Sequence, residues 1–388
     1  MIHAAEAFSG KSRLAVLLDH FSQLEDPRDL RRILHPLPGI LLLVVCGTVA
    51  GCDDHEDIAD WSATHPEGLR GHLPFENGVP GERWLTILMN RVNPALFAAA
   101  FAGRVRESWP DKVDLVAIDG KTSRRSHDRR AGAAPLHLVC AFATAARLVL
   151  AAEAVPDKRS ELAAIPPLPE RPGEGGGLKG ALVSIDAIAT NADIARAIAD
   201  WGADRLLAVK ANQPGLRAEL EAAFAETGAG SLDTCVTLDK GHGRIEERTM
   251  TVLGEVDWLD GERRFPGELR LPGAACLLRA ETRVARAGAT RTETRSFITS
   301  RALTAQDAAA AVRGHRVIEN RLHRVLDVTF ADDQSRIRRG HGARNMATVR
   351  HFALNLVRAA DKPSIKSRRK RAGWSPDYLQ AILSSAPA

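Results

Sequence analysis

Between residues 12 and about 108, apolar positions recur at helical spacing and are interrupted by breaks that contain proline or glycine. The helical stretches read LAVLLDHFSQL, the apolar run after Pro38, EDIADWSATH and NPALFAAAFAGRV. Breaks such as EDPRD and NGVPGE separate them, as is typical of helix ends. The pattern predicts a small helical domain over residues 1–110.

At Val113 the pattern changes to short apolar runs with the character of strands. DLVAID, LHLVCAFA and RLVLAAEAV follow one another closely, which predicts an antiparallel meander. A helix-like SELAAIPPLP and the glycine-rich RPGEGGGLKG come next, followed by the strand ALVSIDA, the helix NADIARAIADWGA, the strand RLLAVKA and the helix QPGLRAELEAAFAE. This alternation predicts a mixed α/β sheet over residues 111–231. The glycine-rich segment lacks the spacing of a phosphate-binding loop, so it is interpreted as a flexible connection.

The remaining chain divides into three further parts. Residues 232–300 carry alternating runs rich in Thr, Val and Arg, such as TCVTLD and RIEERTMTVL, which predict a β-rich insertion. Residues 301–360 return to helical spacing in AQDAAAAVRGHRVIENRLHRVLDV and ARNMATVRHFALNLVRAA, with the basic loop DDQSRIRRGHG between them. Residues 361–388 are interpreted as a basic tail.

Composition indicates a globular chain in a reducing compartment. With 388 residues and 45% hydrophobic content, the chain is long enough to bury more than one core. The longest apolar run, Gly39 to Cys52, is shorter than the roughly 20 residues that a bilayer span requires, and no leader pattern opens the sequence. The five cysteines form no CxxC pair, which favours buried thiols over a zinc site or a disulfide framework. We therefore expect a cytoplasmic protein.

The positive charge is concentrated towards one end of the chain. From Gln334 to Arg371 there are twelve lysines and arginines against the single Asp361, a net charge of +11. Because the whole chain carries only +5, the rest carries −6. This asymmetry indicates a polyanionic partner such as nucleic acid, while a solvated surface helix with a soluble tail would give the same count.

Three acidic residues stand in positions that suit a metal site. Asp119 closes the apolar run DLVAID and Asp186 follows the run ALVSI, so neighbouring strands would bring both carboxylates to adjacent strand ends. Two close carboxylates repel each other unless a cation lies between them. Glu319 lies in a late helix with His315 and His323 four residues to either side. Such an oxygen-rich set suits Mg²⁺ or Mn²⁺.

Each of these residues has a structural alternative when it is taken alone. An aspartate at a strand end also forms turns and caps helices, and a helical glutamate is commonly solvated. The two histidines are interpreted as packing or surface residues rather than zinc ligands. The order of the elements and the apolar context of both aspartates, together with the acidic helix, favour the joint site.

Several ordered motifs resemble the DDE transposases of the ISAs insertion-sequence group, also called H-repeat-associated proteins. They include AIDGKTSRRS, EAVPDKRSEL, ALVSIDAIATNADIARAI, LLAVKANQP, KGHGRIEERT and HRVIENRLHRVLDVTFADDQSRIRRGHGARNMATVRHFALNLVR. The resemblance covers nearly the whole chain. It implies a ribonuclease-H-like core in which a β-rich insertion lies between the second aspartate and the glutamate.

The resemblance also implies a mechanism and a set of partners. Asp119, Asp186 and Glu319 take the positions of the acidic triad, and two Mg²⁺ or Mn²⁺ ions would lie between them, with Asp119 bridging both. Strand cleavage at the ends of the element and strand transfer into a target would be one phosphoryl displacement with different nucleophiles. The expected partner is double-stranded DNA, bound by a homodimer.

Two segments depart from the family pattern. Related transposases carry a tyrosine, an arginine and a lysine around the glutamate, and Val312, His315 and Leu326 occupy those positions here. Arg316, His323 or Arg324 are candidates to replace them. In the N-terminal domain GVPGERWL stands where the family has a GIPSHDTF-like segment. The resemblance therefore does not assign recognition of the terminal repeats to this segment.

Basic residues near the triad are the predicted DNA contacts, with ordinary solvated side chains as the alternative. They are Lys121, Arg124, Arg125, Lys210, Asn212, Arg336, Arg338 and Arg339. An active transposase is the leading hypothesis. A metal-dependent nuclease on the same core, an inactive or repurposed DNA-binding protein, and a structural α/β protein with a basic tail are the alternatives.

Overall fold

The structure is a computed structural model. It describes residues 13–29, 31, 33–66, 69, 75–107, 113–156, 178–185, 190–210, 213–241, 243–254, 256–261, 270–286, 289–358 and 363–384. Asp186, Asn212, the run SELAAIPPLP and most of the glycine-rich connection lie outside these residues, so the predictions for them remain predictions.

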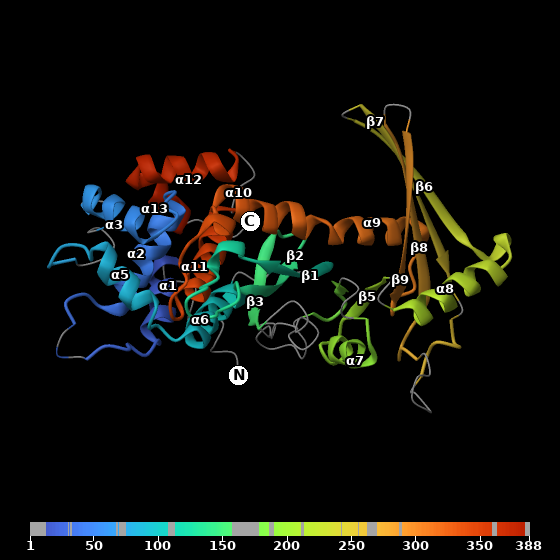
Figure 1. The fold of residues 1–388 in the computed structure, drawn as a ribbon, viewed down its shortest axis with the longest axis horizontal. Coiled ribbons are helices and arrows are strands. Elements are labelled where there is room, and N and C mark those ends of the chain that lie inside the picture. The colour runs from blue at the N-terminus through green and yellow to red at the C-terminus, as the bar shows by residue number, and fades with distance from the viewer. Residues whose placement is uncertain are drawn as a thin grey trace, which may run out of the picture.

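Nine strands of the described chain form one continuous sheet in the order β3-β2-β1-β4-β5-β9-β8-β7-β6 (Figure 1). The strands are β1 (Leu115–Thr122), β2 (His137–Ala143), β3 (Leu148–Val155), β4 (Leu182–Ile185), β5 (Asp204–Val209), β6 (Asp233–Gly241), β7 (Arg244–Leu253), β8 (Cys276–Arg286) and β9 (Ala289–Thr299).

The first five strands form the predicted ribonuclease-H-like core. β1, β2 and β3 pair antiparallel, while β4 and β5 run parallel to β1 on its other side. All seven residues of β2 are buried, as expected for a strand that is covered on both faces. α7 (Ala192–Asp200) connects β4 to β5, and the side chain of Asn191 caps its first turn. The core prediction of a mixed sheet is confirmed.

The predicted β-rich insertion extends this same sheet. β6 to β9 form two antiparallel hairpins, and β9 pairs with β5 at Leu206↔Thr299 to Val209↔Ser296. Figure 1 shows these strands as an arm at one end of the molecule, beside α8 (Pro214–Glu226). α9 (Ala305–His315) leads back from the arm towards β1 and β4 and packs on a second apolar cluster. The insertion is therefore joined to the core by backbone hydrogen bonds.

Helices from both ends of the chain form a layer at the other end of the sheet (Figure 1). They are α1 (Arg13–Ser22), α2 (Leu37–Val49), α3 (His55–Thr64), α5 (Glu82–Met89), α6 (Pro94–Glu107), α11 (Gly342–Val357), α12 (Ile365–Trp374) and α13 (Pro376–Ser384). The N-terminal helices confirm the helical prediction for that region. α5 lies where GVPGERWL departs from the family pattern, and the sequence reasoning did not predict it.

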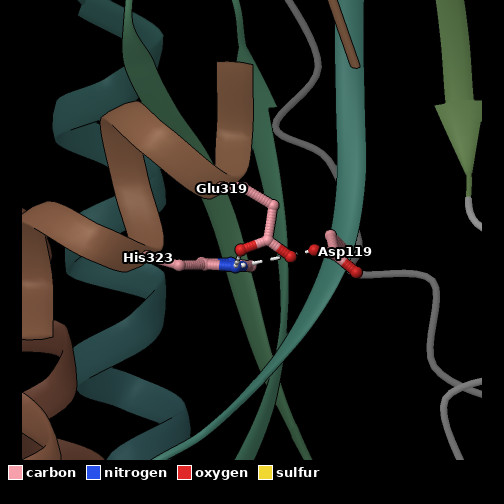
Figure 2. A group of neighbouring side chains, drawn as sticks. All are labelled: Asp119, Glu319 and His323. Carbon is pink, nitrogen blue, oxygen red and sulfur yellow. Dashed lines mark ion pairs between the residues drawn. The ribbon is translucent and has the colours of Figure 1, made fainter. Parts of the chain in front are cut away.

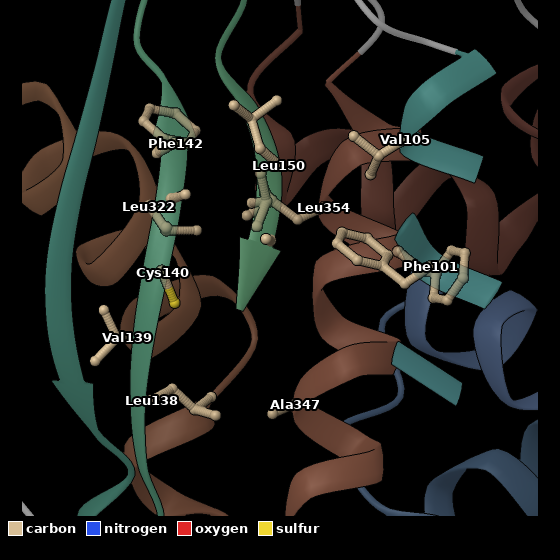
Figure 3. Packing of buried hydrophobic residues seen from close by; sticks show 14 of the residues in the cluster. Phe101, Val105, Leu138, Val139, Cys140, Phe142, Leu150, Leu322, Ala347 and Leu354 are labelled. Carbon is tan, nitrogen blue, oxygen red and sulfur yellow. The ribbon is translucent and has the colours of Figure 1, made fainter. Parts of the chain in front are cut away.

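α11 joins the N-terminal helices to the core. Its Phe352 lies 4.9 Å from the ring of Phe101, 5.5 Å from that of Phe21 and 5.8 Å from that of Phe97, measured between centroids. Figure 3 shows α11 between α6 and the strands β2 and β3, with Leu354 in the interface. Strands, N-terminal helices and α11 thus share one hydrophobic core.

The C-terminal residues, interpreted from the sequence as a basic tail, form the helices α12 and α13. Arg368 and Arg369 of α12 are only 3% and 4% exposed. The Arg369 guanidinium donates hydrogen bonds to the carbonyl oxygens of Thr48 and Cys52 and to the carboxylate of Asp53. Part of the positive charge counted from the sequence is therefore used inside the protein and is not available to a polyanion.

Within the described residues no single helix has the length and apolar composition to cross a bilayer, although α5 and α6, bent by 91°, satisfy both criteria when they are joined.

Candidate active site

Asp119 lies inside β1, which continues to Thr122, and not at the strand end that the sequence predicted. It pairs with Cys140 of β2, and its Oδ1 accepts a hydrogen bond of 2.9 Å from the backbone N–H of Gly120. Its side chain is 17% exposed, so the strand fixes the carboxylate while one side remains open. The apolar residues Val116 to Ile118 before it are buried, and they anchor the strand in the core.

Glu319 and His323 reach the same point from a π-helical turn, Glu319–His323, which follows α9 and precedes α10 (Arg324–Thr329). π-helical turns occur frequently at functional sites. The Nδ1 atom of His323 lies 3.5 Å from Oδ2 of Asp119 and 3.7 Å from Oε2 of Glu319. One ligand atom from each of the three residues lies within 4.8 Å of the others (Figure 2). Residues 200 positions apart in the sequence therefore converge on one point.

The electrostatics keep Glu319 ionised. Its interaction with the His323 side chain lowers the pKa of Glu319 to about 2, against the opposing effect of burial, with smaller contributions from Asp119 and His315. The Glu319 side chain is 64% exposed, whereas that of His323 is 7% exposed. The site thus combines an exposed carboxylate, a partly buried carboxylate and a buried imidazole.

The structure describes β4 up to the residue before Asp186. β4 pairs in parallel with β1, and Ile185 is opposite Ile118, so the pairing between these two strands extends to the residue before each aspartate. His315 does not join the acid pair, because its Nδ1 is hydrogen-bonded at 2.9 Å to Oγ of Ser184 in β4. The position of the Asp186 carboxylate itself stays a prediction.

Lys121 lies in a buried ionic network, contrary to the expectation that it contacts DNA. Its Nζ is 2.5 Å from Asp327, 3.1 Å from Asp332 and 3.6 Å from Asp333, and its side chain is 5% exposed. Burial alone would lower the pKa of Lys121, but Asp332 and Asp327 outweigh it and raise the pKa above its usual value. The ammonium group of Lys121 is therefore almost fully buried and already paired with three carboxylates.

Asp332 connects this network to α11. Its carboxylate accepts hydrogen bonds from Ser123 at 2.8 Å and from Arg350 at 2.7 Å. Burial alone would raise the pKa of Asp332, yet Arg350 and Lys121 hold it below its usual value. The network thereby ties β1, which carries Asp119, to the segment that follows the Glu319 turn.

The other predicted DNA contacts that the structure describes are exposed. Arg124 is 81% exposed and approaches Asp333, while Lys210 is exposed directly after β5. Arg338 donates a hydrogen bond to the carbonyl oxygen of Arg125, so the loops that follow β1 and α10 lie against each other.

A cleft of about 850 Å³ lies between these loops and the N-terminal helices α3 and α5. Its basic lining consists of His55, His127, Arg129, Arg130, Arg336, Arg338 and Arg339. Asp54, Glu56, Glu82 and Asp128 also line it. The cleft therefore presents a basic wall from the core loops and an acidic wall that is mostly from the N-terminal helices.

Comparison with known families identifies the chain. Residues 111–356 match the family described as "Transposase DDE domain", and residues 18–103 match the one described as "DDE_Tnp_1-associated". The chain belongs to the DDE transposase family. The first match contains the sheet, the Glu319 turn and α11, so the family assignment covers the candidate site.

Relatives of this transposase include the H repeat-associated putative transposase YhhI of Escherichia coli K12, which is 32% identical over 381 residues, 96% of this chain and 99% of the relative. The putative transposase YncI of Escherichia coli O157:H7 is 32% identical over 375 residues, 95% and 94% of the two chains. The inactive transposase YbfQ of Escherichia coli K12 is 39% identical over 67 residues, 17% of this chain and 80% of that one. The resemblance to H-repeat-associated proteins is confirmed.

Among solved structures, a piggyBac transposase synaptic complex with hairpin DNA aligns with a TM-score of 0.41 and 9% identity, over 97% of this chain and 83% of that chain.

Two parts of the candidate site were not predicted from the sequence. His323 was interpreted as a packing or surface residue or as a candidate to replace a basic residue of the family, and not as a neighbour of both acids, although its spacing of four residues from Glu319 was visible. Arg129 and Arg130 were not among the predicted DNA contacts, yet they line the cleft. The sequence signal for them is the basic run SRRSHDRR, which continues beyond the predicted contacts Arg124 and Arg125.

Proposed function

We propose that this transposase is an active, divalent-metal-dependent enzyme that cleaves DNA strands at the ends of an insertion sequence and joins them to a target. The observation that carries the proposal is the convergence of Asp119 and Glu319, from a central strand and a late helical turn, to within 4.8 Å. Two carboxylates this close are costly unless a cation offsets their repulsion. Family membership supports the same conclusion.

The donor set fits a divalent metal. Carboxylate oxygens suit Mg²⁺ and Mn²⁺, and we propose that Asp119, Glu319 and Asp186 hold two such ions. The pairing of Ile118 with Ile185 supports the inclusion of Asp186, because each strand reaches its aspartate at the next residue. When bound, the metal would polarise a phosphoryl oxygen and activate a water molecule or a DNA 3′-hydroxyl.

The protein groups hold this arrangement in place. β1 and the buried Lys121–Asp332 contact fix Asp119 relative to the Glu319 turn. The low pKa of Glu319 keeps its carboxylate ionised at neutral pH, ready to bind a cation. Because Glu319 is 64% exposed, a large substrate such as DNA has access to this side of the site.

We propose that DNA phosphates contact the basic wall of the cleft. Its five arginines, at positions 129, 130, 336, 338 and 339, lie on loops that continue from β1 and α10. If all five neutralise phosphates, the logarithm of the binding constant should fall with the logarithm of salt concentration with a slope of about −4.5. The proposal includes a homodimer on two DNA ends in the bacterial cytoplasm.

The test is nicking of DNA that carries the inverted repeat flanking the gene, with Mg²⁺ or Mn²⁺ present. Asp119→Asn, Asp186→Asn and Glu319→Gln should each lower the nicking rate by at least about a hundredfold, the scale on which charge-stabilising groups contribute. DNA binding, measured by fluorescence anisotropy, should persist in all three. The control Glu281→Gln removes an exposed carboxylate of β8 and should retain full activity.

The outcomes separate the competing functions. Nicking without strand transfer would indicate a nuclease on the same core. Tight DNA binding without nicking in the wild-type protein would indicate a repurposed DNA-binding protein. Undiminished nicking by any one of the three variants would remove that residue from the proposed site.

A further inference from the structure

We propose that His323 is a direct metal ligand through Nδ1, and that this nitrogen makes the centre bind Mn²⁺ more tightly than Mg²⁺. The inference rests on the proposed function, because it assigns a further ligand to the same site. It adds a residue that the acidic triad does not contain, and it names the metal that the ligand set favours.

The position of His323 supports a ligand role. Its side chain is 7% exposed, and Nδ1 points between the carboxylates of Asp119 and Glu319 (Figure 2). The Nδ1–oxygen separations of 3.5 and 3.7 Å are longer than the 2.7–3.2 Å of a normal hydrogen bond. The imidazole therefore faces both oxygens across a gap and is held tightly by neither.

The gap between Nδ1 and the two carboxylate oxygens is somewhat wider than in an occupied ion site. Neighbouring ligand atoms of one octahedral ion with bonds of about 2.0–2.2 Å lie roughly 2.8 to 3.1 Å apart. The two measured separations, 3.5 and 3.7 Å, exceed this range by about 0.4 to 0.9 Å, so small side-chain movements of that size would bring the three atoms onto one ion. The π-helical turn provides the required arrangement because it directs Glu319 and His323 to the same point.

The buried ring gains a partner in this arrangement. Nε2 of His323 is buried without a hydrogen-bond partner in the part of the chain that the structure describes. With Nδ1 also beyond normal hydrogen-bond distance, the ring has no short polar contact there. Buried polar groups rarely persist in that state. A metal bound to Nδ1 gives that nitrogen a strong partner and relieves the repulsion between the two carboxylates, whereas Nε2 still has no partner among the described residues.

The ligand type determines the metal preference. Mg²⁺ and Ca²⁺ favour purely oxygen sites, whereas imidazole favours transition metals. Mn²⁺ accepts carboxylate oxygens and binds nitrogen more readily than Mg²⁺ does. Two carboxylates with one imidazole are therefore expected to shift the preference towards Mn²⁺, which an all-carboxylate triad would not do.

The direct test is pulsed electron paramagnetic resonance of the full-length wild-type protein loaded with Mn²⁺ alone. We expect modulation from one ¹⁴N nucleus, and growth on ¹⁵N-histidine should replace it with the ¹⁵N pattern. Bound Mn²⁺ without nitrogen modulation would overturn the inference. This measurement needs no variant, so it does not depend on how well a substitution folds.

Variants provide the second test. His323→Gln and His323→Asn should lose the nitrogen modulation and weaken Mn²⁺ binding at least about tenfold, since even partners of metal ligands change affinity by that factor. Affinity for Mg²⁺, measured by competition with Mn²⁺, should fall less than threefold. The control His35→Gln replaces a histidine that is buried to a similar extent, 5% exposed, in the N-terminal helical region. It should retain both the modulation and the affinity.

Failure of the inference and failure of the proposed function give different results. Nitrogen modulation that persists in both His323 variants, or unchanged Mn²⁺ affinity in a folded variant, would overturn the ligand role. If wild-type nicking still required a metal, the proposed function would stand. If the wild-type protein bound neither Mn²⁺ nor Mg²⁺, the proposed metal centre and the inference would both fail.

Discussion

Replacing Lys121 with methionine should destabilise the protein because it removes a cation that contacts three aspartates. The substitution keeps most of the unbranched apolar stem and removes the terminal ammonium group with its charge and hydrogen-bond donors. In the native protein Nζ lies 3.1 Å from Asp332, whose side chain is 4% exposed. After the change, the enclosed carboxylates lose part of the charge that balances them.

The loss of unfolding free energy depends on how well other partners or water stabilise each aspartate once the Lys121 charge is gone. Breaking a buried ion pair by removing one partner costs roughly 3–5 kcal/mol. Asp332 would keep its contacts with Arg350 and Ser123, and Asp327 and Asp333 are 33% and 24% exposed, so water can solvate them. We therefore expect the lower end, about 3 kcal/mol, which is roughly a hundredfold in the folding equilibrium.

The assay is urea unfolding at pH 7, followed by circular dichroism. Arg217→Met is the matched control, because it removes the cation of an ion pair to Glu221 whose side chains are 46% and 59% exposed. Such a helical surface pair contributes only about 0.3–0.5 kcal/mol. If Lys121→Met shifts the unfolding midpoint no more than Arg217→Met does, the network does not stabilise the fold in the way described.

Two further predictions concern the same region. Because the pKa of Asp332 is held below the usual 3.8, its stabilising effect is complete above that pH and is lost as the pH falls through the lower folded value. The urea midpoint should thus fall more steeply below pH 3.8 in the wild-type protein than in Asp332→Asn, and parallel curves would contradict this. Gly340→Ala should weaken DNA binding. The φ of Gly340 is +50°, and a Cβ there would lie 2.6 Å from the carbonyl oxygen of Asn90, so the loop that carries Arg336, Arg338 and Arg339 would be displaced. Gly243→Ala is the control, with φ +71° and no neighbour within 4 Å, and equal DNA affinity of the two variants would refute the steric argument.

The sequence predicted the features of the core that depend on local pattern. The strand before Asp119 and the strand before Asp186 were visible as apolar runs that end in an acidic residue, and both strands are present and adjacent. The hairpins of the insertion were visible as alternating runs. Glu319 was correctly placed in a late helical segment because helical spacing survives over many residues.

Features that depend on distant contacts were not predictable in the same way. Lys121 stands in a basic run and resembles a DNA contact, and nothing near it shows that three aspartates about 200 positions later enclose it. The proximity of His323 to the acid pair depends on a π-helical turn and on the position of β1, neither of which helical periodicity encodes. The burial of Arg369 likewise becomes visible only when α12 is placed against α2.

The position of Arg369 has a consequence for how the chain folds during its synthesis. Its guanidinium binds carbonyl oxygens at Thr48 and Cys52, so the helical layer begun by the first helices stays incomplete until the last ones leave the ribosome. The surface of the N-terminal helices that α12 covers therefore stays exposed while the strands of the sheet are translated. A polypeptide that terminates before α12 would therefore leave the carbonyl oxygens of Thr48 and Cys52 without this donor and the early helices without their last layer.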